Sequence, residues 1–74
     1  MSHLPRISGR EFVKAMHQLG YEFDRQHGSH MILRQTLPPY HRLTVPNHRE
    51  LPNGTLRSFI RDAGITVEAF KALL

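Results

Sequence analysis

The sequence predicts a small α+β domain in which a three-stranded antiparallel sheet is covered on one face by helices. An apolar stripe at helical spacing lies near the N-terminus, segments with period-two alternation follow it between turn residues, and a second helical stripe comes after them. A three-stranded sheet needs one covered face, and two amphipathic helices can supply that cover. We therefore expect the order α-β-β-β-α plus a short C-terminal helix, in a single domain over residues 1–74.

The first predicted helix begins at a capping box. Ser8 and Glu11 stand three positions apart, so the Ser8 hydroxyl can accept from the Glu11 amide while the Glu11 carboxylate accepts from the Ser8 N–H. Gly20 stands where a left-handed residue would end the helix. The apolar stripe between them is expected to face the core and consists of Phe12, Val13, Met16 and Leu19.

Strands are predicted over residues 21–26, 29–34 and 41–45. His27-Gly28 is the expected hairpin connection, because glycine readily takes positive φ, and the prolines at 38 and 39 place a loop before the third strand. The residues expected to face inward are Tyr21, Phe23, Met31, Leu33, Leu43 and Val45. The residues expected on the open face are Glu22, Asp24, His30, Ile32, Arg34, Arg42 and Thr44.

The second helix is expected to start at Asn53, a favourable N-cap residue, and to end before Gly64. Thr66 is expected to cap the short last helix. The apolar positions of the second helix follow the spacing i, i+3, i+4, i+7 and are Leu56, Phe59, Ile60 and Ala63.

The composition favours a polyanionic partner. The chain carries 10 Lys and Arg against 6 Asp and Glu, a formal net charge of +4, and a basic excess attracts RNA or DNA. With no cysteine there is no disulfide framework, and no apolar run reaches the ~20 residues that span a bilayer. We expect a cytoplasmic protein that does not enter a membrane.

His30 is the candidate for chemistry. Alternation places its imidazole on the open face beside Arg34, and imidazole can exchange a proton near neutral pH. His27 and His30 also form a His-x-x-His pattern, but across a turn the two rings need not converge and no further ligand completes a tetrahedral set in sequence. We expect no metal and no cofactor.

Three blocks of the sequence resemble the HicA family of toxin ribonucleases, the mRNA interferases. These blocks are Gly28-Ser29-His30 opening the second strand, Val45-Pro46-Asn47-His48 ending the third, and Gly54-Thr55-Leu56-Arg57 opening a helix. The resemblance covers nearly the whole chain. It implies a fold like a double-stranded-RNA-binding domain, which agrees with the element order inferred from the pattern.

The resemblance implies a small toxin that cleaves mRNA and is held inactive by a HicB-type antitoxin protein. The family's catalytic histidine lies in its Gly-Ser-His motif, which is His30 here. His48 matches the histidine after the family's Val-Pro, with a structural or RNA-contacting role. Cationic side chains would contact single-stranded RNA around His30, and the candidates are Arg34, Arg42, Lys14 and Arg25.

A non-catalytic RNA-binding module with the same fold is the alternative, because a fold does not fix a function. Such modules read duplex RNA through several phosphate contacts across successive grooves. Around Asn53 to Leu56 the chain offers Arg57 as the nearby cation. A histidine placed for proton transfer therefore fits RNA cleavage better than RNA binding without cleavage. It also argues against a domain that binds protein partners alone.

Overall fold

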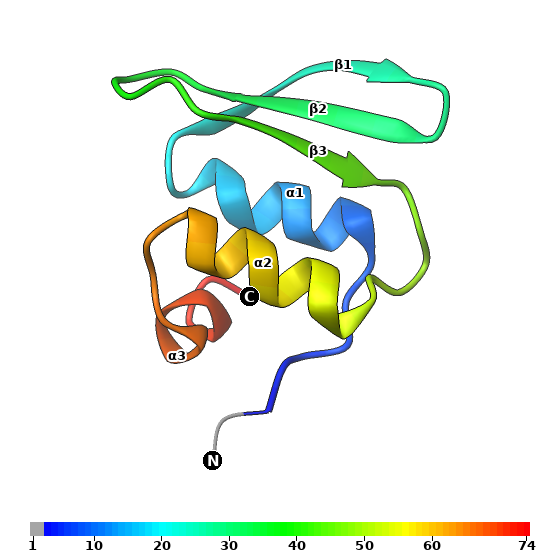
Figure 1. The fold of residues 1–74 in the computed structure, drawn as a ribbon, viewed down its shortest axis with the longest axis vertical. Coiled ribbons are helices and arrows are strands. Elements are labelled where there is room, and N and C mark those ends of the chain that lie inside the picture. The colour runs from blue at the N-terminus through cyan, green and yellow to red at the C-terminus, as the bar shows by residue number, and fades with distance from the viewer. Residues whose placement is uncertain (1–2) are drawn as a thin grey trace.

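The computed structural model describes residues 3–74 and confirms the predicted fold class (Figure 1). In chain order its elements are α1 (Gly9–His17), β1 (Tyr21–His27), β2 (His30–Gln35), β3 (Arg42–Pro46), α2 (Asn53–Asp62) and α3 (Val67–Lys71). The strands form one antiparallel sheet in the order β1-β2-β3.

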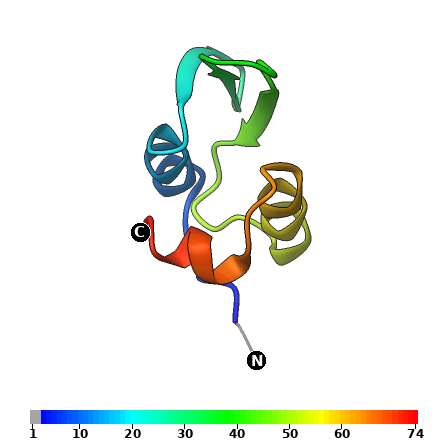
Figure 2. The same ribbon diagram turned by 90° about the vertical axis from the view of Figure 1, so that its left-hand side faces the viewer.

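The helices lie on one side of the sheet. Figure 2 shows α1 and α2 side by side below the sheet, with α3 beneath them. The Phe12 ring contacts those of Phe59 and Phe70, with centroid distances of 5.1 and 5.5 Å. These contacts join the three helices. The strand residues that close the core against these helices include Tyr21, Met31, Leu33, Leu43 and Val45, all buried as predicted.

Of the three predicted N-caps, two are confirmed and one is wrong. Ser8 Oγ accepts from the Glu11 amide at 3.1 Å and Glu11 Oε1 accepts from the Ser8 amide at 2.9 Å. Thr66 Oγ1 accepts from the Ala69 amide at 3.0 Å. Asn53, by contrast, is already the first helical residue of α2, so Pro52 is the N-cap and no side chain caps this end.

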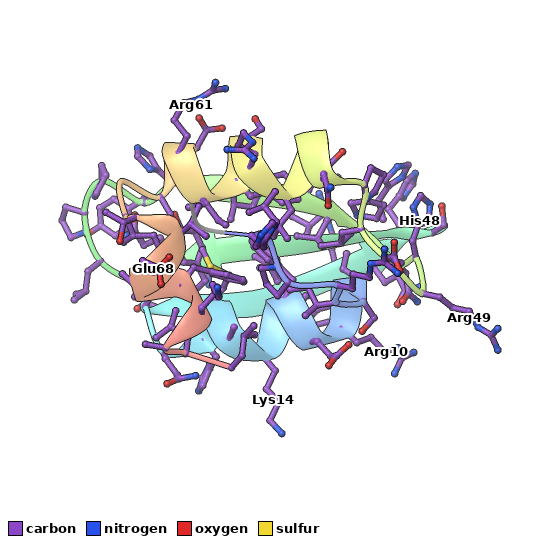
Figure 3. All side chains as sticks on the ribbon, turned by 90° about the horizontal axis from the view of Figure 1, so that it is seen from below. Arg10, Lys14, His48, Arg49, Arg61 and Glu68 are labelled. Atoms are coloured by element: carbon purple, nitrogen blue, oxygen red, sulfur yellow. The ribbon has the colours of Figure 1, made fainter. Side chains whose placement is uncertain are left out.

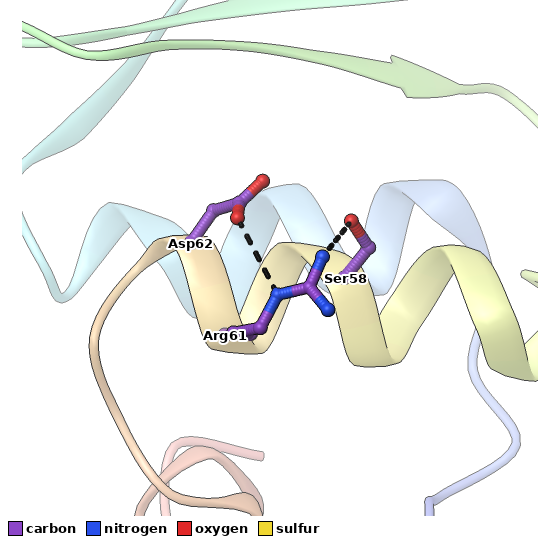
Figure 4. Close-up of polar contacts among 3 residues, drawn as sticks. All are labelled: Ser58, Arg61 and Asp62. Atoms are coloured by element: carbon purple, nitrogen blue, oxygen red, sulfur yellow. Dashed lines mark hydrogen bonds and ion pairs between the residues drawn. The ribbon is translucent and has the colours of Figure 1, made fainter.

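The C-terminal half of α2 carries polar contacts at its surface. Arg61 lies 3.9 Å from the Asp62 carboxylate through Nε and donates to Ser58 Oγ over 3.4 Å (Figure 4). These contacts place the Arg61 guanidinium along its own helix, on the side of the sheet opposite the open face. Within residues 3–74, no helix combines the length and apolar character that crossing a membrane requires.

The β1–β2 connection differs from the prediction by one residue. His27 pairs with His30, so the two loop residues are Gly28 and Ser29, and His27 belongs to the strand. Gly28 has φ +61° while Ser29 does not have positive φ. A positive φ at the first loop position alone is the pattern of a type II′ turn, and glycine is the residue preferred there.

Phe23 was expected in the core, and its burial was predicted wrongly. It is opposite Leu33, a fully buried residue, so it lies on the helix-facing side of the sheet as expected. Its side chain is nevertheless 52% exposed. β1 is an edge strand, and at this position it is covered less completely than the central strand is.

Candidate functional site

The open face of the sheet is defined by the pairing register. Residues directly opposite one another in an antiparallel pair share a face, and Met31 and Leu33 are buried against the helices. The alternate positions of β2 therefore lie on the face away from the helices, together with their partners on both neighbours. These open-face residues are Glu22, Arg25 and His27 of β1, His30, Ile32 and Arg34 of β2, and Arg42, Thr44 and Pro46 of β3.

His30 is the first residue of the central strand and its side chain is exposed. It lies between His27 on β1 and Pro46 on β3. The backbone around it is well held, because the Asn47 amide donates to the Ser29 carbonyl over 2.7 Å. This bond joins the end of β3 to the hairpin turn. The exposed His30 imidazole therefore lies at an end of the sheet that a backbone hydrogen bond closes. We call this region the hairpin end; it consists of residues 27–30 together with Pro46 and Asn47.

Arg34 and Arg42 share the open face with His30 but lie toward its other end. They are opposite one another, and Arg34 is four residues beyond His30 along β2, or about 13 Å at ~3.3 Å per residue. Arg42 also forms an ion pair with Asp24, with 3.8 Å between Nη1 and Oδ2. Both arginines are exposed on this face, and neither is placed beside His30.

The prediction for the second half of β1 needs a correction. Phe23 is opposite Leu33 and Arg25 is opposite Ile32, so Asp24 is an extra residue, a β-bulge. Past the bulge the alternation is reversed. Arg25 therefore lies on the open face as a full member of the strand, and so does His27, which the sequence pattern had assigned to the turn.

The other two candidate contact residues lie elsewhere. Figure 3 shows Lys14 pointing outward from α1, a helix on the side of the sheet opposite the open face. His48 follows β3 at the hairpin end; its side chain is exposed, and its carbonyl accepts from the Gly9 amide over 2.9 Å. Arg10 and Arg49 extend at the same end of the molecule. These two arginines were missed because they belong to no strand pattern; only the fold brings them to this end.

No site for a metal is evident in the described part of the chain. Across residues 3–74, no group of three or more His, Cys, Asp or Glu side chains is arranged to hold a metal ion. His27 and His30 face one another, so the geometric reason given for setting aside the His-x-x-His pattern does not hold. What the pair lacks is a third ligand.

Comparison with protein families identifies the class of protein. Residues 9–65 match the family model described as the HicA toxin of bacterial toxin-antitoxin systems. The match spans α1, the whole sheet and α2. The chain therefore belongs to the HicA toxin family, and a toxin of this kind is paired with an antitoxin. No solved structure matches the chain.

Proposed function

We propose that this toxin is a metal-independent endoribonuclease that cleaves mRNA in the cytoplasm and thereby stops growth, with His30 as a catalytic residue. The observation that carries the proposal is the position of His30: exposed, on the uncovered face of the sheet, at a hydrogen-bonded strand end. Family membership supplies the toxin role. The positive charge of the chain supplies attraction for a polyanion.

RNA carries its own nucleophile, the ribose 2′-hydroxyl. A base takes the proton from this hydroxyl, the oxygen attacks the adjacent phosphorus, and the bond from phosphorus to the 5′-oxygen breaks when that oxygen receives a proton. The products are a 2′,3′-cyclic phosphate and a 5′-hydroxyl. Imidazole suits both proton transfers at cellular pH, and arginine stabilises the charge that develops on the phosphate.

RNA would lie along the open face, with the scissile phosphate at the hairpin end. Arg25, on β1, is the open-face arginine closest in register to that end. Arg34 and Arg42 would contact phosphates further along the RNA. His48 would contact RNA that extends beyond the end of β3. Lys14 lies on the helical layer, so in this arrangement its contribution is limited to the general positive field.

The antitoxin, a HicB-type protein, would cover the same face. Ile32 is a partly buried apolar residue in the middle of this polar face. A protein partner could bury Ile32 completely and neutralise the neighbouring arginines. Such a complex would block access to His30, which gives inhibition a direct physical basis.

The test compares His30→Gln with His41→Gln. Both histidines are exposed residues of the same sheet region, but His41 directly precedes β3 at the end opposite the hairpin. We expect His30→Gln to lose RNA cleavage by ~10²–10⁴-fold, the usual contribution of general acid–base catalysis, while His41→Gln cleaves like the wild type. Both should unfold at the wild-type temperature.

Two outcomes would contradict the proposal. Folded His30→Gln that cleaves at the wild-type rate would remove this residue from the mechanism, and His48 would be the next position to test. A wild-type protein that binds RNA with measurable affinity and never cuts it would favour the non-catalytic RNA-binding module instead.

A further inference from the structure

The β-bulge at Asp24 changes which side chains of β1 reach the open face. Without it, the alternation that places Phe23 toward the helices would also place Arg25 and His27 on the helix side. With it, Gln26 takes that side: it is opposite Met31, and both line a hollow beside Val13 of α1. The location of Gln26 is therefore independent support for the reversed alternation.

The reversal puts His27 directly opposite His30. Their Cβ atoms are expected to lie roughly 4.5–5.5 Å apart, as in any facing pair of antiparallel residues. Both side chains are exposed. In residues 3–74 neither ring forms a hydrogen bond or an ion pair, so the ring nitrogens of both are available to a ligand.

The backbone holds this pair in place. The type II′ turn at Gly28 and Ser29 closes the hairpin immediately after His27, and Gln26 Nε2 donates to the Gly28 carbonyl over 3.0 Å. The bond from Asn47 to Ser29 fixes the other side of the turn. Two imidazoles are thus presented side by side on a hairpin whose geometry is set by hydrogen bonds.

We propose that His27 is a second catalytic residue, which works with His30 as an acid–base pair on one scissile phosphate. This inference rests on the proposed ribonuclease function and deepens it by assigning the second proton-transfer group. One imidazole accepts the proton of the 2′-hydroxyl as the oxygen–phosphorus bond forms. The other, as imidazolium, donates a proton to the 5′-oxygen as its bond to phosphorus breaks. One proton is taken and one is given, and exchange with water restores both rings.

Arg25 complements the pair. It lies two positions before His27 on the same strand and face, opposite Ile32. Its guanidinium can reach a phosphate held between the two rings and stabilise the added negative charge without taking part in proton transfer. The bulge therefore places both a cation, Arg25, and a second imidazole, that of His27, on the same face as His30.

The experiment uses purified wild type, His27→Gln and His30→Gln, with His41→Gln as the matched control. Initial rates on a short RNA are measured from pH 5 to 9. We expect a bell-shaped profile for the wild type, a ~10²–10⁴-fold lower rate for His27→Gln, and loss of one limb of its profile. The control should keep the wild-type rate and both limbs. A purely structural role for His27 would lower the rate through unfolding and leave both limbs in place, so thermal unfolding is measured alongside.

A second substrate with sulfur in place of the 5′-bridging oxygen separates the two roles. The thiolate leaving group departs without protonation, so this substrate restores the rate of the variant that lacks the acid and not of the variant that lacks the base. Rescue of one variant alone supports the pair. A wild-type rate and full bell for His27→Gln, or rescue of both variants or of neither, overturns the inference. A wild-type rate for His30→Gln would instead remove His30 from the proposed mechanism, and a wild-type protein that binds RNA without cutting it would overturn the proposed function, so these failures are distinguishable.

Discussion

Replacing Gly9 with alanine should destabilise the protein, although Gly→Ala in a helix normally stabilises it. Gly9 is the first residue of α1, and its amide donates to the His48 carbonyl over 2.9 Å. A Cβ added here would collide with the carbonyl oxygen of Pro46, and it would lie 3.1 Å from Met31 Cε. The methionine can move aside, but the carbonyl belongs to the backbone of β3 and cannot rotate away.

The expected magnitude follows from opposing contributions. Helix propensity favours alanine by at most ~1 kcal/mol, while forcing an extra carbon into a packed site costs about 1–3 kcal/mol. Weakening of the Gly9–His48 hydrogen bond adds about 0.5–1.5 kcal/mol. The net loss should be about 0.5–3.5 kcal/mol, and each kcal/mol lowers Tm by about 4–8 °C in a domain of this size.

Gly54 provides the matched control. It is the second residue of α2, with nothing within 4 Å of an added Cβ and no positive φ. Gly54→Ala should therefore stabilise the protein by ~0.5–1 kcal/mol. Thermal and urea unfolding of both variants gives the comparison. If Gly9→Ala is as stable as the wild type, or if both variants shift in the same direction, the packing argument is refuted.

The Gly9 variant also has a consequence for the site. Pro46 is the cross-strand partner of His30, so a Pro46 carbonyl displaced by the added methyl group moves the backbone next to the proposed catalytic histidine. We expect cleavage by Gly9→Ala to fall even at temperatures where the variant is fully folded. Gly54→Ala, which makes no such contact, should keep the wild-type rate.

Further predictions concern metal, salt and pH. Cleavage should persist in excess chelator and leave 5′-hydroxyl ends, because the 2′-hydroxyl mechanism needs no metal ion; metal-dependent recovery or 5′-phosphate products would contradict this. RNA affinity should fall steeply with salt, and Arg34→Ala and Arg42→Ala should each weaken it alike across sequences, since phosphate contacts carry no sequence information; a salt-independent affinity would argue against it. Burial, with a smaller effect of the Asp62 carboxylate, raises the pKa of Tyr21 above its ordinary value of 10.0. The unfolded chain then loses this proton first, so stability should decline as pH rises above about 10. Tyr21→Phe should reduce that decline and Tyr40→Phe, at an exposed position, should not.

Sequence periodicity was sufficient for the core because it depends on local geometry. Met31, Leu33, Leu43 and Val45 alternate along strands whose register has no interruption, and all four are buried. The capping box at Ser8 is equally local, since all of its partners lie within one turn. Where both the cause and the effect lie within a few residues, the pattern predicts the structure.

β1 could not be predicted in the same way, because its second half depends on its partner strand. The segment Tyr21–His27 alternates without glycine or proline, so nothing within it indicates a bulge at Asp24. The Gly28-Ser29 dipeptide was the usable sign: glycine followed by a small polar residue fits a type II′ turn. Reading the turn there pairs His27 with His30 from the sequence alone. The bulge then follows, since Phe23 must still be opposite Leu33.

The bulge at Asp24 is better explained by what it positions than by what it stabilises. An extra residue interrupts the ladder of β1, and the local compensation is an ion pair from Asp24 to Arg42 over 3.8 Å, with side chains 31% and 60% exposed. Solvent-accessible pairs of this kind contribute ~0–1 kcal/mol. The large effect is geometric: the residues after the bulge change faces, and this brings Arg25 and His27 to the open face. In the proposed chemistry, a one-residue bulge in an edge strand completes the site around His30.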